Sequence, residues 1–140
     1  MKYISTKPEI TKEMLSGMQG VIPSTLSTAS KDGIPNVTFI SQMFYVDSRH
    51  VALSFQFMNK TWRNLQENPV ATAIITSPDT FSMWKVKLRY LEIQTEGPIF
   101  EQMEMQLMAI TSMMKIKIDF VIKAALICKV ESVEVIYEGE

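Results

Sequence analysis

Residues 81–95, FSMWKVKLRYLEIQT, alternate between two kinds of side chain over an unusually long distance. One side of an extended chain would carry Met83, Lys85, Lys87 and Arg89, and the other Trp84, Val86, Leu88 and Tyr90. A repeat of two residues is the period of a β-strand with one buried face, and it does not fit an amphipathic helix. The chain must therefore build a sheet that covers a core on one side.

Five further segments have the β-branched, aromatic or alternating composition of strands. They are residues 23–30, 36–46, 51–57, 70–76 and 124–137. Turn signals separate them: KDGIP, where Gly33 tolerates a positive φ, then DSRH and SPD. The chain is therefore predicted to form a mainly β fold of about six antiparallel strands.

Helical patterns are few. Residues 10–20 predict a short leading helix with Thr11 as its cap and a glycine at its end. Residues 59–68 predict a second short helix, which Asn68-Pro69 must end because a residue before proline avoids the α region. A longer helix starts near Pro98, and its apolar stripe consists of Phe100, Met103, Leu107, Ile110 and Met114. So few helices among antiparallel strands favour a small barrel, which also leaves no exposed sheet edges.

Composition limits the possible functions. At 140 residues the chain is expected to form a single domain over residues 1–140. Its net charge of −1 provides no positively charged surface of the kind that binds nucleic acid. No apolar run reaches the length of a membrane span, and no signal peptide is evident, so we expect a cytoplasmic protein. Cys128 and His50 are the single cysteine and histidine, which argues against a zinc site.

The segment 59–68, NKTWRNLQEN, places four anion-binding side chains at the start of its helix. Backbone N–H groups are unpaired there and the helix dipole is positive. Lys60 adds a charge, Thr61 a hydroxyl and Arg63 a planar fork, while Asn59 begins the helix. These residues form either a phosphate clamp or a plain exposed helix, and local chemistry leaves both readings open.

The order of these segments resembles the pyridoxamine 5'-phosphate oxidase-like family of FMN-binding split barrels. The likeness covers about residues 21–103 and rests on the series strand, DG turn, strand, strand, basic helix, NP, strand, together with LRYLEIQTEGPIFEQM. It implies an antiparallel six-stranded split β-barrel that forms a homodimer, with FMN at the dimer interface.

The resemblance also implies which residues bind FMN. Lys60, Thr61 and Arg63 would hold the phosphate, and Asn59 would shape the turn. The ribityl chain and ring would lie against the remaining contacts, Asn36, Val37, Thr38, Ser41 and Ser54. For any one of these strand residues, ordinary sheet packing is the alternative. Trp84 and Arg89 are further candidates, to reach the partner's flavin.

The chain departs from the oxidase at its substrate site. Uncharged Asn36 and Ser41 stand where the oxidase usually has basic residues, Thr61 replaces a second basic residue, and the ending VESVEVIYEGE has no Arg- and Trp-rich segment. We therefore expect an FMN-dependent oxidoreductase with a substrate and an electron donor that the sequence does not define. Non-catalytic flavin or haem binding for sensing or storage, a deazaflavin enzyme and a flavin reductase are the alternatives.

No side chain stands out as a catalytic base or nucleophile. Flavin chemistry needs none, because hydride transfer occurs on the flavin ring. Cys128 is expected to be a buried, inert thiol, and the methionines at 103, 105, 108, 113 and 114 are expected to fill the core or to line a dimer seam.

Overall fold

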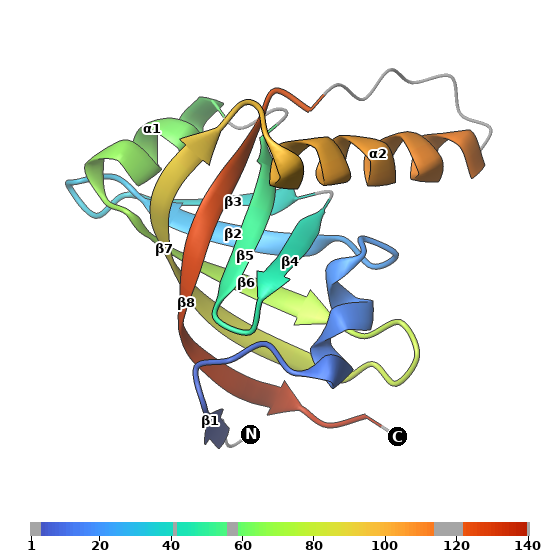
Figure 1. Cartoon of the computed structure of the whole chain (residues 1–140). Helices are drawn as coiled ribbons and strands as arrows, with labels where there is room; N and C mark the ends of the chain where they lie inside the picture. Colours follow the sequence, from blue (N-terminus) through green and yellow to red (C-terminus); the bar gives the residue numbers. More distant parts are fainter. Residues whose placement is uncertain (1–3, 41, 56–58, 114–121, 140) are drawn as a thin grey trace.

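The structure, a computed structural model, describes residues 4–40, 42–55, 59–113 and 122–139 (Figure 1). Its strands are β1 (Ile4–Thr6), β2 (Ser24–Ala29), β3 (Pro35–Ile40), β4 (Met43–Asp47), β5 (His50–Phe55), β6 (Val70–Thr76), β7 (Met83–Gln94) and β8 (Ala124–Tyr137). The helices are the 3₁₀ helix η1 (Lys12–Met18) and the α-helices α1 (Asn59–Glu67) and α2 (Pro98–Met113). All three predicted helices are therefore present, the first as a 3₁₀ helix.

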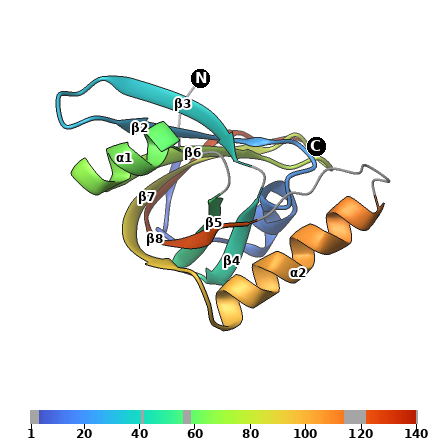
Figure 2. The same ribbon diagram turned by 90° about the horizontal axis from the view of Figure 1, so that it is seen from above.

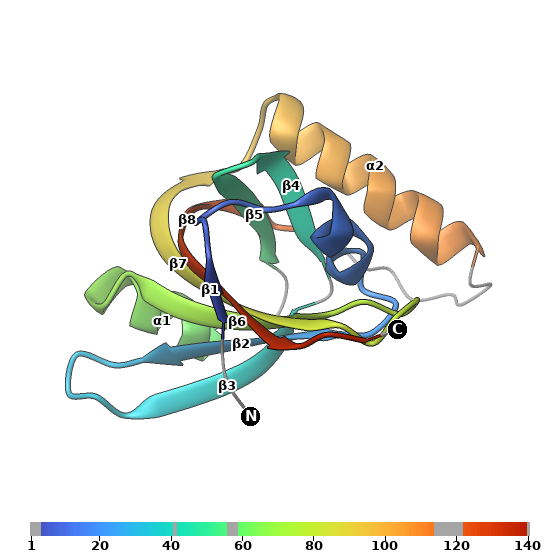
Figure 3. The ribbon, with the colours of Figure 1, turned by 90° about the horizontal axis from the view of Figure 1, so that it is seen from below.

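All paired strands are antiparallel, in the order β3-β2-β6-β7-β8-β5-β4, with β1 added to β8. Figures 1 and 3 show the sheet curving round a central space, with β4 and β5 facing β2 and β6. The two ends of this order, β3 and β4, follow each other in the chain, and no ladder joins them within the described residues. The expected antiparallel split barrel is confirmed.

The single strand predicted over residues 36–46 is wrong. The chain instead makes β3, which pairs with β2, and then β4, which pairs with β5 at the other end of the sheet. Ile40, Gln42 and Met43 lie where the chain crosses from β3 to β4, and all three are buried. The sequence there keeps the composition of a strand and gives no turn signal. The three-residue β1 was also missed, because its exposed side chains carry no alternation.

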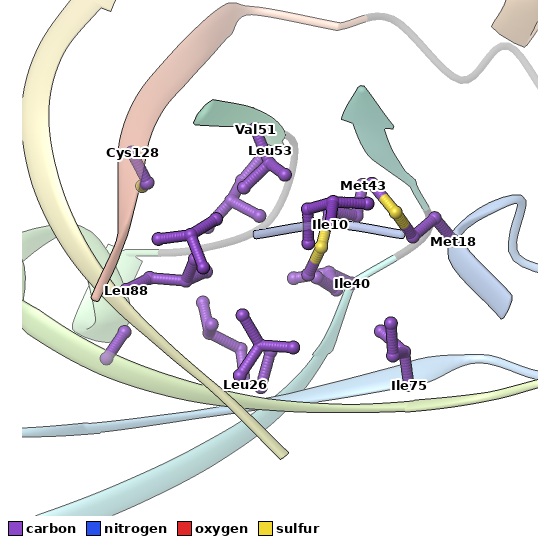
Figure 4. Close-up of a cluster of buried hydrophobic side chains, with 14 of the residues drawn as sticks. Ile10, Met18, Leu26, Ile40, Met43, Val51, Leu53, Ile75, Leu88 and Cys128 are labelled. Carbon is purple, nitrogen blue, oxygen red and sulfur yellow. The ribbon is translucent and has the colours of Figure 1, made fainter. Parts of the chain in front are cut away.

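The main core fills the inside of the barrel. The alternation predicted for β7 is confirmed: Trp84, Val86 and Leu88 point inward and are buried. Figure 4 shows residues from other elements meeting them there, among them Leu26 of β2 and Leu53 of β5. Burial of these apolar side chains is the main source of the fold's stability.

The helix α2 covers the outside of the sheet beside β4 and β5 (Figure 2). Met103 and Leu107 pack there in a second cluster with Phe44, Ala52 and Ile127. The expectation of core methionines is right for Met103, but Met105, Met108 and Met113 are exposed on the opposite face of the helix. Met114 lies outside the described residues. Within the described ranges, no helix has the length and hydrophobicity that crossing a bilayer requires.

Candidate functional site

The helix α1 lies against β2 and β3, and two side-chain hydrogen bonds fix it there. Asn36 Nδ2 of β3 donates to Thr61 Oγ1 over 3.3 Å, and Asn64 Nδ2 donates to Thr28 Oγ1 of β2 over 3.1 Å. Asn64, Thr28 and Thr61 are buried. Within the described residues α1 spans Asn59–Glu67, so its end before Asn68-Pro69 agrees with the sequence; the residues before Asn59, which would show whether it caps the helix, lie outside the described ranges.

A ring cluster supports the same helix from its other side. Trp62 contacts Phe55 of β5 and Tyr90 of β7 edge to face, each at a ring-centroid distance of 5.6 Å. Such contacts stabilise beyond the apolar area that they bury. Desolvation at this cluster raises the pKa of Tyr90, with smaller contributions from Cys128 and Glu92. The start of α1 is therefore held rigidly over the barrel.

Lys60 and Arg63 are both exposed, and they lie one helical turn apart. Neither makes an ion pair with any residue that the structure describes. The structure thus brings two free cations to the positive end of a fixed helix. Thr61, between them in sequence, has its side chain 1% exposed and turned toward Asn36.

The predicted strand contacts fall into two groups. Asn36 and Thr38 are half-buried on the same side of β3, whereas Val37 is 65% exposed on the opposite side. Thr38 Oγ1 donates to the carbonyl of Phe39 over 3.4 Å. Ser41 lies outside the described residues. The structure therefore brings Asn36 to α1 and directs Val37 away from it.

Ser54 lies near the end of β5, beside the segment in which the chain crosses from β3 to β4. Its backbone N–H donates to the Gln42 carbonyl at 3.4 Å, and its hydroxyl donates to the same oxygen at 3.5 Å. Gln42 is 4% exposed, and its Nε2 donates to Gln106 Oε1 of α2 over 2.6 Å. Among the described residues, the other end of the Gln42 amide, Oε1, has no hydrogen-bond partner. Sequence reasoning did not single out Gln42, which stands next to Ser41 in a strand-like run.

The other candidates lie elsewhere. Trp84 is buried in the barrel core, and Arg89 Nε donates to Glu131 Oε2 over 3.2 Å. His50 Nδ1 lies 2.9 Å from Asp47 Oδ1 in the β4–β5 turn, and this hydrogen bond is the main cause that lowers the pKa of Asp47. Burial raises the pKa of the Cys128 thiol to about 12. No three His, Cys, Asp or Glu side chains gather as a metal site in the part of the chain that the structure describes.

The donor set of this region fits a phosphorylated aromatic cofactor. Two cations and the unpaired N–H groups of a helix start suit a phosphate. The half-buried inner side of β3, with Asn36 and Thr38, begins beside this helix start.

Comparison with known proteins identifies the family of the chain. Residues 10–134 match the family model described as "Pyridoxamine 5'-phosphate oxidase". An uncharacterized protein of Methanocaldococcus jannaschii is 38% identical over 63 residues, which span 44% of this chain and 42% of that protein. The chain thus matches less than half of the length of this curated relative.

Solved structures show the same fold. An FMN-binding protein from Syntrophomonas wolfei superposes with a TM-score of 0.74 at 18% identity, over 90% of this chain and 87% of that one. An F420 reductase gives a TM-score of 0.64 at 12% identity, over 89% and 98% of the two chains. The haem storage protein HutZ from Vibrio cholerae gives 0.52 at 12% identity, over 84% and 81%.

Proposed function

Because this chain belongs to the pyridoxamine 5'-phosphate oxidase family, we propose that it binds FMN and works as an FMN-dependent oxidoreductase. The observation that carries the proposal is the pair of free cations at the start of α1, with the helix fixed to the sheet through Asn36 and Thr61. A phosphate fits such a site because fixed N–H donors and charged side chains converge on it without reorganisation.

The individual residues take different parts in this site. Lys60 and Arg63 bind the phosphate as charged donors, and Asn59 opens the helix whose N–H groups face it. Thr61 has its hydroxyl engaged by Asn36, so we assign both residues to holding the helix in place as well as to lining the site. We assign Thr38 and Ser54 to contacts with the ribityl chain and ring, as the family resemblance implies; Ser41, the further candidate, lies outside the described residues.

A flavin carries out hydride or electron transfer at its own ring. The protein therefore has to bind and orient the flavin and the substrate and to exclude water. Lys60 and Arg63, exposed on the first turn of α1, leave the phosphate reachable from solvent. The proposal does not specify the substrate or the electron donor.

Haem is the alternative that the structure disfavours. Its iron usually takes a His or Cys ligand. His50 is hydrogen-bonded to Asp47 in the β4–β5 turn, and Cys128 is buried with a raised pKa. Deazaflavin and a flavin bound without turnover would use the same residues at the start of α1. The absorption spectrum of the purified protein distinguishes flavin, deazaflavin and haem, and bleaching by NADH or NADPH distinguishes an enzyme from a binder.

We also propose a homodimer. Phe39 and Ile74 lie in the same row across β3, β2 and β6, and Val37 is on the next row, so the outer face of this sheet end is apolar and exposed. β3 is an end strand with an unpaired edge. Such a surface tends to associate. A second copy is the occupant that the family resemblance implies.

The test compares FMN with riboflavin, which has the same ring and no phosphate. FMN should bind more tightly, and Lys60→Ala or Arg63→Ala should weaken FMN alone. Charge-assisted hydrogen bonds contribute about 1.5–3 kcal/mol, so each variant should lose about tenfold to a hundredfold in affinity. Lys7→Ala, which removes an exposed lysine far from α1 along the chain, is the matched control and should change neither ligand. Equal affinities for FMN and riboflavin in every variant would refute the phosphate site.

A further inference from the structure

An open cavity at the end of the barrel opposite α1 has no part in the proposed FMN site. Its volume is about 530 Å³, and it is lined by η1, the turn between β6 and β7, the start of β7 and Gly139. β6 runs over about 20 Å from the end of α1 to this turn, and Figures 1 and 3 show α1 and η1 on opposite sides of the barrel. Cavities of this size are typical of small-molecule sites.

Hydroxyl groups form one wall of the cavity. Ser82 Oγ accepts hydrogen bonds from Thr80 Oγ1 over 3.0 Å and from the Gly139 N–H over 2.9 Å, and its own hydrogen donates to no described residue. Ser16 Oγ and Ser77 Oγ lie 3.2 Å apart and share one hydrogen, so the second hydrogen of this pair can donate outward. The wall thus offers two hydroxyl donors to a ligand.

Trp84 provides a third donor. It is 7% exposed, and its indole N–H donates to no residue that the structure describes. This nitrogen is not fully enclosed, because the enclosed side-chain atoms without a partner are Gln42 Oε1 and Glu131 Oε1. Since Trp84 lines the cavity, its N–H can find an acceptor there. Buried indole N–H groups usually have a partner, so this one points to a ligand.

The rim of the cavity carries more negative than positive charge. Lys12, Glu13 and Asp79 are exposed there, and none of them makes an ion pair with a described residue. Two carboxylates against one ammonium group disfavour a phosphate or another anion. Carboxylates accept hydrogen bonds, so the rim and the wall together suit a ligand that both donates and accepts.

The turn between β6 and β7 is strained at the cavity. Phe81 has a φ of 62°, in the left-handed region that a bulky residue rarely adopts, and its N–H donates to the Ser77 carbonyl over 2.9 Å. Strain of this kind concentrates at ligand sites. Gly139 closes against the same turn so tightly that a Cβ atom would collide with the Thr80 carbonyl. The fold therefore holds this wall in a fixed shape.

We propose that this cavity binds a neutral, hydroxyl-rich ring of the size of a hexose. Sugar hydroxyl groups donate and accept hydrogen bonds, so they complement the free donors of the wall and the carboxylates of the rim. The site is separate from the start of α1 and does not depend on FMN.

The experiment follows the two tryptophan indole peaks in a ¹H–¹⁵N NMR spectrum while glucose, galactose or mannose is added. The chain has two tryptophans, so Trp62, which contacts Phe55 and Tyr90 near α1, is an internal control. The Trp84 peak, identified by its loss in Trp84→Phe, should shift in a saturable way with at least one hexose. The Trp62 peak should not move, and FMN should not change the result.

Two variants test the donors with the hexose that binds best. Trp84→Phe and Ser16→Ala should each weaken its binding about fivefold, measured through the Gly139 amide peak. Ser112→Ala, at an exposed serine of α2, is the matched control and should change nothing. If Trp84→Phe fails to fold, the wild-type spectrum and Ser16→Ala still decide.

Two further ligands separate the alternatives. Cyclohexanol, a six-membered ring with one hydroxyl group, and glucose 6-phosphate, an anion, should both bind at least about fivefold more weakly than the best hexose. Equal binding of cyclohexanol would overturn the recognition of hydroxyl groups, and tighter binding of the phosphate would overturn the neutral ligand. A Trp84 peak that none of the three hexoses moves would overturn the proposal and leave the FMN site untouched.

Discussion

Replacement of Thr28 by Val tests how α1 is held in place. The two side chains have nearly the same shape, so the change removes one hydroxyl and leaves the packing intact. Thr28 is 4% exposed and Asn64 5%, and the hydroxyl accepts the Asn64 amide hydrogen bond over 3.1 Å. In Thr28→Val that N–H stays buried with no acceptor, which costs about 1–3 kcal/mol of unfolding free energy.

The loss is measurable by urea unfolding and by thermal melting. For a chain of this size, 1 kcal/mol corresponds to a shift of about 2–4 °C in Tm. Thr95→Val is the matched control, because Thr95 is exposed in the turn between β7 and α2; a surface change there should stay within about 0.5 kcal/mol. FMN affinity should fall with Thr28→Val, since the helix that carries Lys60 and Arg63 loses one of its two side-chain hydrogen bonds to the sheet.

A double-mutant cycle completes the test. Thr28→Val combined with Asn64→Leu removes both partners, so it should be less destabilising than the sum of the two single changes. An additive cycle, or a Thr28→Val protein as stable as wild type, would refute the view that this hydrogen bond fixes α1.

Two other predictions follow from exposure and burial. Cys128 should react slowly with thiol reagents in the folded protein and should still be slow at pH 9, because it is buried and a pKa of about 12 keeps nearly all of the thiol protonated there; fast labelling would show that β8 opens. Phe39→Lys should convert the proposed dimer to a monomer in light scattering, since Phe39 is 71% exposed on the outer face of β3. Phe81→Lys, at another exposed phenylalanine in the β6–β7 turn, should leave the mass unchanged, and a monomeric wild type would contradict the dimer.

Much of the fold could be predicted from local sequence patterns. The alternation in residues 83–94 and 124–137 matches β7 and β8, because a half-buried strand imposes a period of two on its side chains. The end of α1 was equally predictable, because proline at 69 limits the helix by sterics alone.

What the sequence could not reveal depends on contacts between distant residues. The break between β3 and β4 follows from which strands they pair with, and nothing in ISQM marks it. Likewise, nothing in the sequence shows that Asn36 donates a hydrogen bond to Thr61, 25 residues away, and so fixes the helix that carries Lys60 and Arg63. The hydrogen bond from Gln42 to Gln106, 64 residues away, was equally invisible. Such partners are set by the tertiary fold.

The place of β8 in the sheet has a consequence for how the chain is made. This strand occupies an inner position, between β7 and β5, yet it follows the other seven described strands in the chain. Until it leaves the ribosome, β3-β2-β6-β7 and β5-β4 are two separate ladders, each with an open inner edge. The apolar strands of the nascent chain can therefore pair wrongly until residues 124–137 emerge, and chaperones should be needed up to that point. A chain released before residue 124 lacks the strand that joins the two ladders and should aggregate.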